Sequence, residues 1–205
     1  MEISHELAYL YFSQVFFTIL SYFLGSLCSA IIVCRIFDLS DPREGGSGNP
    51  GATNVLRLHG KKYAAMVLVG DMLKGTIPVL LGHLFNLPAD YLGWIALAAV
   101  LGHMFPIFFK FKGGKGVATA LGAFFGMHIY FGAICLALWI VIAKFLKYSS
   151  LASIITLLFA PIIGVIIMGN SGILMPLLLM ALFIIAQHRE NIQRLSKGEE
   201  SKIKF

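Results

Sequence analysis

A run of small and polar residues from Gly46 to Arg57 contains the first side chains in this chain that are suited to binding a charged ligand. Its glycines let neighbouring backbone N–H groups point into one concavity, and such a nest binds anions, phosphate above all. The guanidinium of Arg57 suits bidentate contact with a phosphate. Short side chains that hydrogen-bond backbone or ligand oxygens lie between them, namely Ser47, Asn49, Thr53 and Asn54. The run predicts a phosphate site, with a flexible loop as the alternative.

Gly46, Gly48 and Gly51 also fit the spacing of a dinucleotide-binding motif, and Asp71 follows twenty residues after the last of them. That motif needs a preceding strand and a βαβ unit. Apolar runs of membrane-spanning length flank it here, so the sequence argues against a dinucleotide site.

A second stretch, GGKGVAT at residues 113–119, places a lysine among glycines at the predicted start of a helix. It is not a Walker loop, because Phe109 replaces the first glycine of that motif and Gly116 replaces its serine or threonine. Even so, free N–H groups at a helix start, the helix dipole and the lysine all favour an anion. The alternative is an anchor of snorkelling lysines, which explains Lys110 and Lys112 but not the glycines.

The end of the last apolar run adds His188 and Asn191, which are three residues apart and share a helix face. A lone histidine at such a place is usually only a polar residue at an interface. Its position at the same membrane face as the two glycine-rich stretches keeps a binding role open. Ser149, Ser150 and Ser153 begin another apolar run at this face and would on their own indicate only a helix start.

Lys74 is the only basic residue deep inside a predicted span, and Asp71 lies three residues earlier on the same helix face. Charges inside a membrane are costly, so they face the bundle interior and pair. The pair is either structural or functional, and its distance along the chain from the other motifs argues against direct chemistry. His103 is interpreted as a structural residue near a helix end.

Several catalytic patterns are missing from the sequence. It contains no His-x-x-x-x-Asp pair, no Gly-x-Ser-x-Gly elbow and no cluster of Asp and Glu that suggests a Mg²⁺ site. Cys28, Cys34 and Cys135 all fall in apolar runs, as expected of small buried side chains. We expect no metal and no cofactor, so a reaction here would depend on binding and positioning anions.

The composition places these motifs in a membrane protein. Hydrophobic residues make up 58% of the chain, charged residues only 13%, and the mean hydropathy is +0.84. Soluble domains contain about 25% charged residues. The net charge of the chain is +6. The positions of the Lys and Arg residues matter more than this sum, because they lie in connections between apolar runs. We therefore expect the lipid bilayer as a partner and no nucleic acid.

We predict an all-α integral membrane protein with a single polytopic domain, residues 1–205, and seven transmembrane helices. About 20 apolar residues span a bilayer as a helix. The predicted spans are residues 8–35, 61–82, 91–109, 115–127, 129–146, 149–168 and 172–188. The fourth and fifth are short, which suggests that they are tilted, incomplete or shielded from lipid.

The connections between the predicted spans indicate the orientation. Lysine and arginine occur in the connections after spans one, three and five and in the C-terminal tail, whereas the other three connections have none. Positive connections stay in the cytoplasm. We therefore predict an N-terminus outside, a C-terminus in the cytoplasm, and an active site at the cytoplasmic face.

These motifs together resemble one family, the bacterial membrane glycerol-3-phosphate acyltransferases that use acyl phosphate as donor. The resemblance is carried by SGNPGATN (47–54), GDMLKG (70–75) and GHMFPIFFKFKGGKGVAT (102–119), and HRENIQRL (188–195) supports it. It covers nearly the whole chain and implies a seven-span fold in the bacterial cytoplasmic membrane. It also implies acyl transfer from acyl phosphate to the 1-hydroxyl of sn-glycerol 3-phosphate, which gives lysophosphatidic acid and inorganic phosphate.

The resemblance further implies roles for single residues. Acyl-phosphate binding is implied for Ser47, Gly48, Asn49, Gly51, Thr53, Asn54, Gly114 and Gly116. Glycerol-3-phosphate binding is implied for Arg57, Lys115, Ser153, His188 and Asn191. Catalysis is expected of Lys115, Arg57 and Ser47, and the proton acceptor is either a phosphate oxygen of the substrate or His188.

The main rival is a membrane transporter of phosphate esters, which would also need basic phosphate sites. A transporter places polar sites along a route near the membrane midplane, whereas Asp71 and Lys74 are the only obvious deep charges here. A structural membrane protein is the second rival, and it leaves the glycine-rich motifs unexplained.

Overall fold

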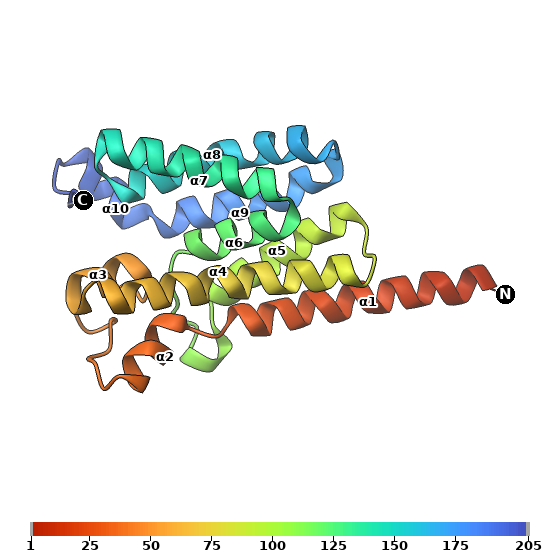
Figure 1. The fold of residues 1–205 in the computed structure, drawn as a ribbon, viewed down its shortest axis with the longest axis horizontal. Coiled ribbons are helices and arrows are strands. Elements are labelled where there is room, and N and C mark those ends of the chain that lie inside the picture. Colours follow the sequence, from red (N-terminus) through yellow and green to blue (C-terminus); the bar gives the residue numbers. More distant parts are fainter. Residues whose placement is uncertain (1, 204–205) are drawn as a thin grey trace.

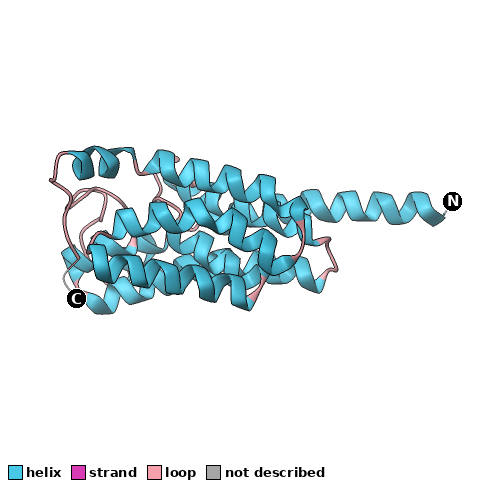
Figure 2. Cartoon of the chain, turned by 90° about the horizontal axis from the view of Figure 1, so that it is seen from above, coloured by secondary structure: helices cyan, strands magenta, loops and turns pink. Residues whose placement is uncertain are grey.

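The computed structural model consists of α-helices and describes residues 2–203, with side chains described from Leu7 onward (Figure 1). Met1, Lys204 and Phe205 lie outside the described residues, so the structure covers the predicted domain 1–205 from residue 2 to residue 203. The helices in chain order are α1 (Glu2–Gly25), α2 (Ser29–Ile36), α3 (Ala52–His59), α4 (Lys61–Leu84), α5 (Ala89–Met104), η1 (Ile107–Phe109), α6 (Val117–Met127), α7 (Ile129–Leu146), α8 (Ser149–Met168), η2 (Ser171–Ile173), α9 (Leu174–Gln187) and α10 (Arg189–Ser196), where η denotes a short 3₁₀ helix. The all-α prediction is confirmed (Figure 2).

The lengths of these helices suit a membrane protein. Within residues 2–203, five stretches are long and apolar enough to cross a bilayer: Leu7–Gly25, Lys61–Leu84, Ala89–Phe109, Ile129–Leu146 and Ser149–Met168. Ser171–Gln187 and Arg189–Ser196 pass the same test as one pair bent by 58°, which raises the number to six. Helix α6, with 11 residues, is shorter than a bilayer-spanning helix. The predicted integral membrane class is confirmed.

The first predicted span, 8–35, is wrong in that it is not one helix. Helix α1 ends at Gly25, and α2 begins after a break of three residues. Gly25 packs so closely on α5 that a Cβ would lie 2.1 Å from the Ala99 carbonyl oxygen. The break leaves the Leu27 carbonyl outside both helices, and Lys74 Nζ donates a hydrogen bond to it at 2.8 Å. The break thus coincides with close packing of α1 on α5 and with a hydrogen bond from the buried ammonium group of Lys74.

Helix α6 lies inside the bundle against α4, α5 and α7. Two glycines allow α4 and α6 to approach each other closely. A Cβ on Gly75 would lie 2.1 Å from the Thr119 carbonyl oxygen, and a Cβ on Gly122 would lie 2.0 Å from that of Met72. Small residues bring helix backbones together in this way in membranes. Because other helices surround α6, it can be short, so of the three alternatives for the fourth span (tilted, incomplete or shielded) the packing favours shielding.

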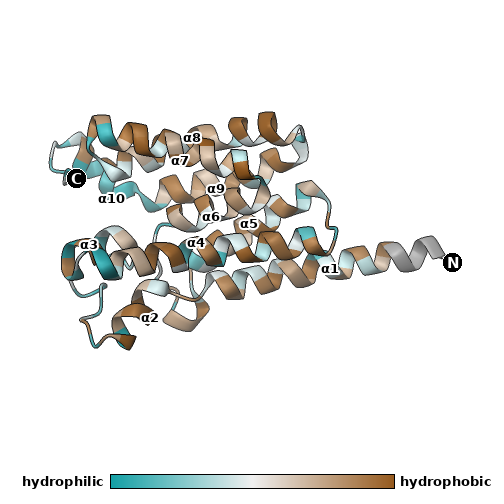
Figure 3. Cartoon of the chain, viewed as in Figure 1, coloured by the Kyte–Doolittle hydropathy of each residue, from teal (hydrophilic) through white to brown (hydrophobic). Residues whose placement is uncertain are grey.

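The two ends of the bundle differ in polarity. Helices α3 and α10 and the C-terminus lie together at one end, and the N-terminal part of α1 extends beyond the other (Figure 1). Hydrophilic residues gather at the end that carries α3 and α10 (Figure 3). We call this end the polar end. It contains the predicted site residues of the two glycine-rich stretches and of the end of the last apolar run.

Candidate active site

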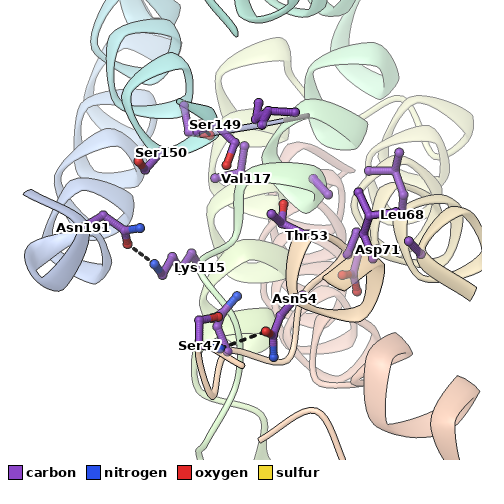
Figure 4. Close-up of a pocket in the computed structure, with 18 of the residues that line it drawn as sticks. Ser47, Thr53, Asn54, Leu68, Asp71, Lys115, Val117, Ser149, Ser150 and Asn191 are labelled. Atoms are coloured by element: carbon purple, nitrogen blue, oxygen red, sulfur yellow. Dashed lines mark hydrogen bonds between the residues drawn. The ribbon is translucent and has the colours of Figure 1, made fainter. Parts of the chain in front are cut away.

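A cavity of about 1130 Å³ lies at the polar end, between the loop before α3 and helices α4, α6, α7, α8 and α10 (Figure 4). Most of the predicted site residues line it: Ser47, Asn49, Gly51, Thr53, Asn54, Arg57, Lys115, Gly116, Ser153, His188 and Asn191. Gly48 and Gly114 are the two predicted residues outside its lining. The fold thus brings distant stretches of the chain to one site.

The loop before α3 is folded around the side chain of Asn54 (Figure 4). The Ser47 N–H donates to Asn54 Oδ1 at 2.9 Å, and Asn54 Nδ2 donates to the carbonyls of Pro42 at 2.7 Å and Gly45 at 3.0 Å. Gly46 has a φ of 61°, and a Cβ there would lie 2.2 Å from Asn54 Oδ1. The amide of Asn54, implied to bind acyl phosphate, is therefore engaged in holding this loop.

Two further amides of the expected nest are also engaged within the loop. The Gly48 N–H donates to the Gly45 carbonyl at 3.0 Å, and the Gly51 N–H donates to the Asn49 carbonyl at 2.9 Å. Gly48 has a φ of 68°, a left-handed conformation that favours glycine. These glycines therefore shape the loop, while their own N–H groups are used inside it.

The start of α3 offers amides to the cavity instead. The first hydrogen bonds of this helix run back to the Gly51 carbonyl, so the N–H groups of Ala52 and Thr53 have no partner within the helix. Both residues line the cavity. The side chains of Ser47 and Asn49 line it beside them. The groups on this side that could bind an anion are thus a helix start and short polar side chains.

The second glycine-rich stretch differs from the expectation in one respect. The N–H groups of Gly113 and Gly114 are not free, because they donate to the carbonyls of Met104 and His103, both at 3.2 Å. A Cβ on Gly113 would lie 2.0 Å from the His103 carbonyl oxygen, and one on Gly114 would lie 2.3 Å from His103 Nε2. Glycine is needed at these positions for close packing on the end of α5.

Lys115 and the start of α6 retain the expected arrangement. Gly116 has a φ of 86° and precedes the helix, whose first hydrogen bond is accepted by the Gly116 carbonyl. Val117 and Ala118 line the cavity, and their N–H groups have no partner within the helix. Lys115 Nζ donates to Asn191 Oδ1 across the cavity (Figure 4). An ammonium group and a helix start therefore lie together, as anion binding requires.

The C-terminal tail contributes a carboxylate that sequence reasoning missed. Glu200 Oε1 accepts hydrogen bonds from Ser150 Oγ at 2.7 Å and Asn191 Nδ2 at 2.6 Å, and its Oε2 accepts one from Arg194 Nε at 2.7 Å. Asn191 thereby links Glu200 to Lys115. The spacing of Asn191 and Arg194, three residues apart on α10, was a usable signal for the arginine. The return of the tail to the cavity was not visible in the sequence.

The charges on this side of the cavity influence one another. Burial lowers the pKa of Lys115 below its usual range, and the Arg194 cation lowers it further, while Glu200 opposes the shift. Burial alone would raise the pKa of Glu200, but hydrogen bonds from its three neighbours outweigh burial and lower this pKa. Arg57 lines the same cavity. Four Lys and Arg side chains line the cavity with two carboxylates, and this excess of cations suits an anionic ligand: Arg57, Lys61, Lys115 and Arg194 against Asp71 and Glu200.

His188 lies in the bend between α9 and α10 and is buried. Its Nδ1 is 2.7 Å from the Ile184 carbonyl oxygen, which can only accept a hydrogen bond, so Nδ1 carries a proton. In the neutral ring, Nε2 is therefore the nitrogen that can accept a proton. The geometry is compatible with a base at this position.

Ser153 has a more restricted role than the family resemblance implies. Its hydroxyl donates to the Ser149 carbonyl at 2.8 Å and accepts from Trp139 Nε1 at 3.0 Å. The hydroxyl proton is therefore committed to the backbone of α8. Ser153 lines the cavity, and so does Trp139, which the sequence analysis did not select.

One part of the cavity lining is apolar, and we call it the apolar wall. It consists of side chains from α3, α4, α6 and α7, namely Leu56, Ala64, Ala65, Leu68, Met72, Leu121 and Leu136. Asp71 and His103 also line the cavity, although Asp71 is far along the chain from the other motifs. In the described part of the chain, no group of three His, Cys, Asp or Glu residues is placed to hold a metal ion.

The chain matches a known family over most of its length. The family model described as glycerol-3-phosphate acyltransferase matches residues 15–198. This chain belongs to that family. The predicted resemblance is thereby confirmed, and the protein is a glycerol-3-phosphate acyltransferase enzyme.

Curated relatives and solved structures agree with this assignment. The glycerol-3-phosphate acyltransferase of Legionella pneumophila (strain Corby) is 50% identical over 191 residues, which cover 93% of this chain and 69% of the relative. That of Shewanella sp. (strain MR-4) is 50% identical over 199 residues, which cover 93% and 95%. The glycerol 3-phosphate form of PlsY (YgiH), an integral membrane glycerol 3-phosphate acyltransferase, is 40% identical, with a TM-score of 0.87 over 94% of this chain and 96% of that one. A lysophosphatidic acid form of the same protein has a TM-score of 0.85.

Proposed function

We propose that this acyltransferase moves a fatty acyl group from acyl phosphate to the 1-hydroxyl of sn-glycerol 3-phosphate. The products are lysophosphatidic acid and inorganic phosphate, and the step is the first acylation of phospholipid synthesis. One observation carries the proposal: a single cavity combines two helix starts, several cations and an apolar wall. Two phosphate groups and one acyl chain are the ligands that such a cavity suits. The solved glycerol 3-phosphate and lysophosphatidic acid forms of PlsY support the acceptor and the product.

The two substrates take opposite sides of the cavity in this proposal. Acyl phosphate lies against the start of α3 and the side chains of Ser47, Asn49 and Thr53, with its chain along the apolar wall. Glycerol 3-phosphate lies against Lys115 and Asn191, with Arg57, His188 and Ser153 near it. Gly48, Gly51, Asn54, Gly114 and Gly116 then act by shaping the two loops, which refines the binding roles that the resemblance implies.

The reaction itself needs little help from a strong protein base. The 1-hydroxyl oxygen attacks the acyl carbonyl carbon, and the bond from this carbon to the phosphate oxygen breaks. Lys115, Arg57 and the helix-start amides stabilise charge on the tetrahedral intermediate and on the departing phosphate. Holding both reactants in contact supplies much of the acceleration. The hydroxyl proton passes to a phosphate oxygen of the substrate, with His188 Nε2 as the alternative acceptor.

We also propose the finer topology. Counting α6 as a short seventh crossing leaves the N-terminus outside and the C-terminus in the cytoplasm of a bacterial inner membrane. The separation of α3, α10 and the tail from the opposite end of the bundle supports this arrangement (Figure 1). The active site then meets soluble glycerol 3-phosphate at the cytoplasmic face while the acyl chain stays in lipid.

Phosphate release tests the proposal directly. Purified protein is given palmitoyl phosphate with and without glycerol 3-phosphate, in buffer with a chelator. Release that depends on glycerol 3-phosphate, with an equal amount of lysophosphatidic acid, is the expected result. No release from folded protein would contradict the proposal, and uptake of phosphate esters by reconstituted vesicles would then favour the transporter.

A further inference from the structure

Three buried ionisable side chains join α4 to α5 beside the cavity. Asp71 Oδ1 lies 2.8 Å from Lys74 Nζ and 3.6 Å from His103 Nδ1, and the three side chains are only 3–6% exposed. Lys74 also reaches the Leu27 carbonyl at the break between α1 and α2. Charges are costly to bury in a membrane. Because burying these charges is costly, we expect a function for a cluster that joins α4, α5 and the break between α1 and α2.

The imidazole of His103 contacts the second glycine-rich loop. A Cβ on Gly114 would lie 2.3 Å from His103 Nε2 and 3.0 Å from its Cε1. The same Cβ would lie 3.3 Å from the Pro50 carbonyl oxygen, which belongs to the loop before α3. The His103 ring and the Pro50 carbonyl therefore both lie on the side of Gly114 where a Cβ would be, and Gly114 packs against both of them.

We propose that His103 is a positioning residue that fixes the spacing between the two loops. The ring lies beside the Asp71–Lys74 ion pair, with its Nδ1 3.6 Å from Asp71 Oδ1. It sets the position of Gly114, and Gly114 precedes Lys115 and the start of α6. The loop before α3 approaches the same side of Gly114 through the Pro50 carbonyl. This inference rests on the proposed function, because the two loops hold the two substrates. His103 thus sets how closely the acceptor hydroxyl approaches the acyl carbon.

The kinetic consequence follows from this geometry. A displacement of about 1 Å between reacting groups can lower a rate roughly 100-fold. Each substrate still finds its own groups, because the start of α3 and Lys115 are intact. A shift in spacing therefore lowers kcat and leaves both KM values nearly unchanged.

Two substitutions at His103 distinguish a role in positioning Gly114 from a role in stabilising the buried charge of Asp71. His103→Asn keeps a donor near the place of Nδ1, toward Asp71, and removes the part of the ring that contacts Gly114. His103→Gln reaches the place of Nε2, toward Gly114, and gives up the donor toward Asp71. We expect His103→Asn to lower kcat by about 100-fold and His103→Gln to be roughly tenfold more active than it. A purely structural role predicts the reverse order.

Gly114 provides a second test from the opposite side of the contact. Gly114→Ala places a methyl group against the His103 ring, and His103→Ala removes that ring. We expect the double variant to lose less kcat than the product of the two single losses. Gly113→Ala is the matched control, because its Cβ would lie 2.0 Å from the His103 carbonyl oxygen, which His103→Ala leaves in place. The losses in that pair should multiply.

The order of measurements keeps the inference and the proposed function distinguishable. Wild-type protein that releases no phosphate from palmitoyl phosphate and glycerol 3-phosphate would overturn both. An active wild type in which His103→Asn equals or exceeds His103→Gln, or in which His103 and Gly114 losses multiply, would overturn only the inference. If the His103 variants do not fold, Gly114→Ala decides: lowered kcat at unchanged KM supports positioning, and unchanged kcat contradicts it.

Discussion

The two sides of the cavity are built in different ways. On the α3 side, the loop is held by backbone hydrogen bonds, by glycines in left-handed conformations and by the buried amide of Asn54. On the α10 side, Lys115, Arg194 and Glu200 are held through polar side chains that hydrogen-bond one another. The α3 side is therefore sensitive to added volume, whereas the α10 side is sensitive to a change in charge.

In the proposed function, this difference lets one cavity hold two phosphate groups at separate places. A loop fixed by its backbone keeps one shape whether or not a ligand is bound. Long charged side chains lose rotamer entropy when they are ordered, and Asn191 and Glu200 limit that loss before a ligand arrives. We therefore expect the first side to select its ligand by shape and the second by charge.

Removing the charge of Lys115 should have the largest effect on this comparison. Lys115→Met deletes the ammonium group and its hydrogen bond to Asn191, and we expect kcat to fall roughly 10²–10³-fold. Steady-state phosphate release at saturating substrates measures the loss. Lys112→Met is the control, because Lys112 is exposed in the same loop. Unchanged turnover in Lys115→Met would refute the charge-sensitive description of the α10 side.

A single methyl group should disable the α3 side. A Cβ on Gly46 would lie 2.2 Å from Asn54 Oδ1, whereas one on Gly48 would be 3.5 Å from its nearest neighbour, the Arg43 carbonyl oxygen. We expect Gly46→Ala to lower kcat/KM about 100-fold, as loss of positioned groups does, and Gly48→Ala to lower it less. Steady-state phosphate release over a range of substrate concentrations measures both losses.

Backbone strain needs its own control in that comparison. Gly60 has a φ of 88°, and a Cβ there would have no atom within 4 Å, so Gly60→Ala adds strain without a contact. It should cost about 1–3 kcal/mol in the free energy of unfolding, with activity retained. Equal losses of activity in the Gly46 and Gly60 variants would mean that strain, and not contact with Asn54, limits the α3 side.

His188→Gln tests which group accepts the proton. Gln cannot act as a base, but it can keep a hydrogen bond at the bend between α9 and α10. If the substrate phosphate accepts the proton, kcat stays within about tenfold of wild type, because general-base catalysis contributes roughly 10²–10⁴-fold where it operates. A loss of that larger size at saturating substrates would make His188 the base.

Glu200→Gln should give the smallest effect, and a pH-dependent one. The pKa of Glu200 is lowered from its usual 4.5, so the charged form stabilises the folded protein above that pH. The stabilisation is lost as pH falls through the lowered pKa. Thermal unfolding should therefore show a lower Tm for Glu200→Gln at neutral pH, with the difference shrinking below pH 4.5. A Tm difference that is constant with pH would contradict this assignment.

The membrane class, most helices and the polar end of this protein could be predicted from the sequence. These properties depend on local composition, such as the apolar runs and the glycine-rich motif around Lys115, and local composition is readable along the chain. The break after Gly25 was not predicted, because it depends on the close approach of Ala99 on another helix.

The hydrogen-bonding roles of individual polar groups were decided only by the tertiary structure. The resemblance implied that Asn54 binds ligand, and the structure shows its amide engaged in hydrogen bonds within its own loop. The Gly114 N–H was expected to be free, and it donates a hydrogen bond to the His103 carbonyl near the end of α5. Glu200 reaches the cavity from a tail that the motifs did not connect with it, and His103, which the sequence indicated only as a structural residue, lines the cavity as well. A hydrogen bond depends on distance and direction in space, and the sequence specifies which groups exist but not which of them meet.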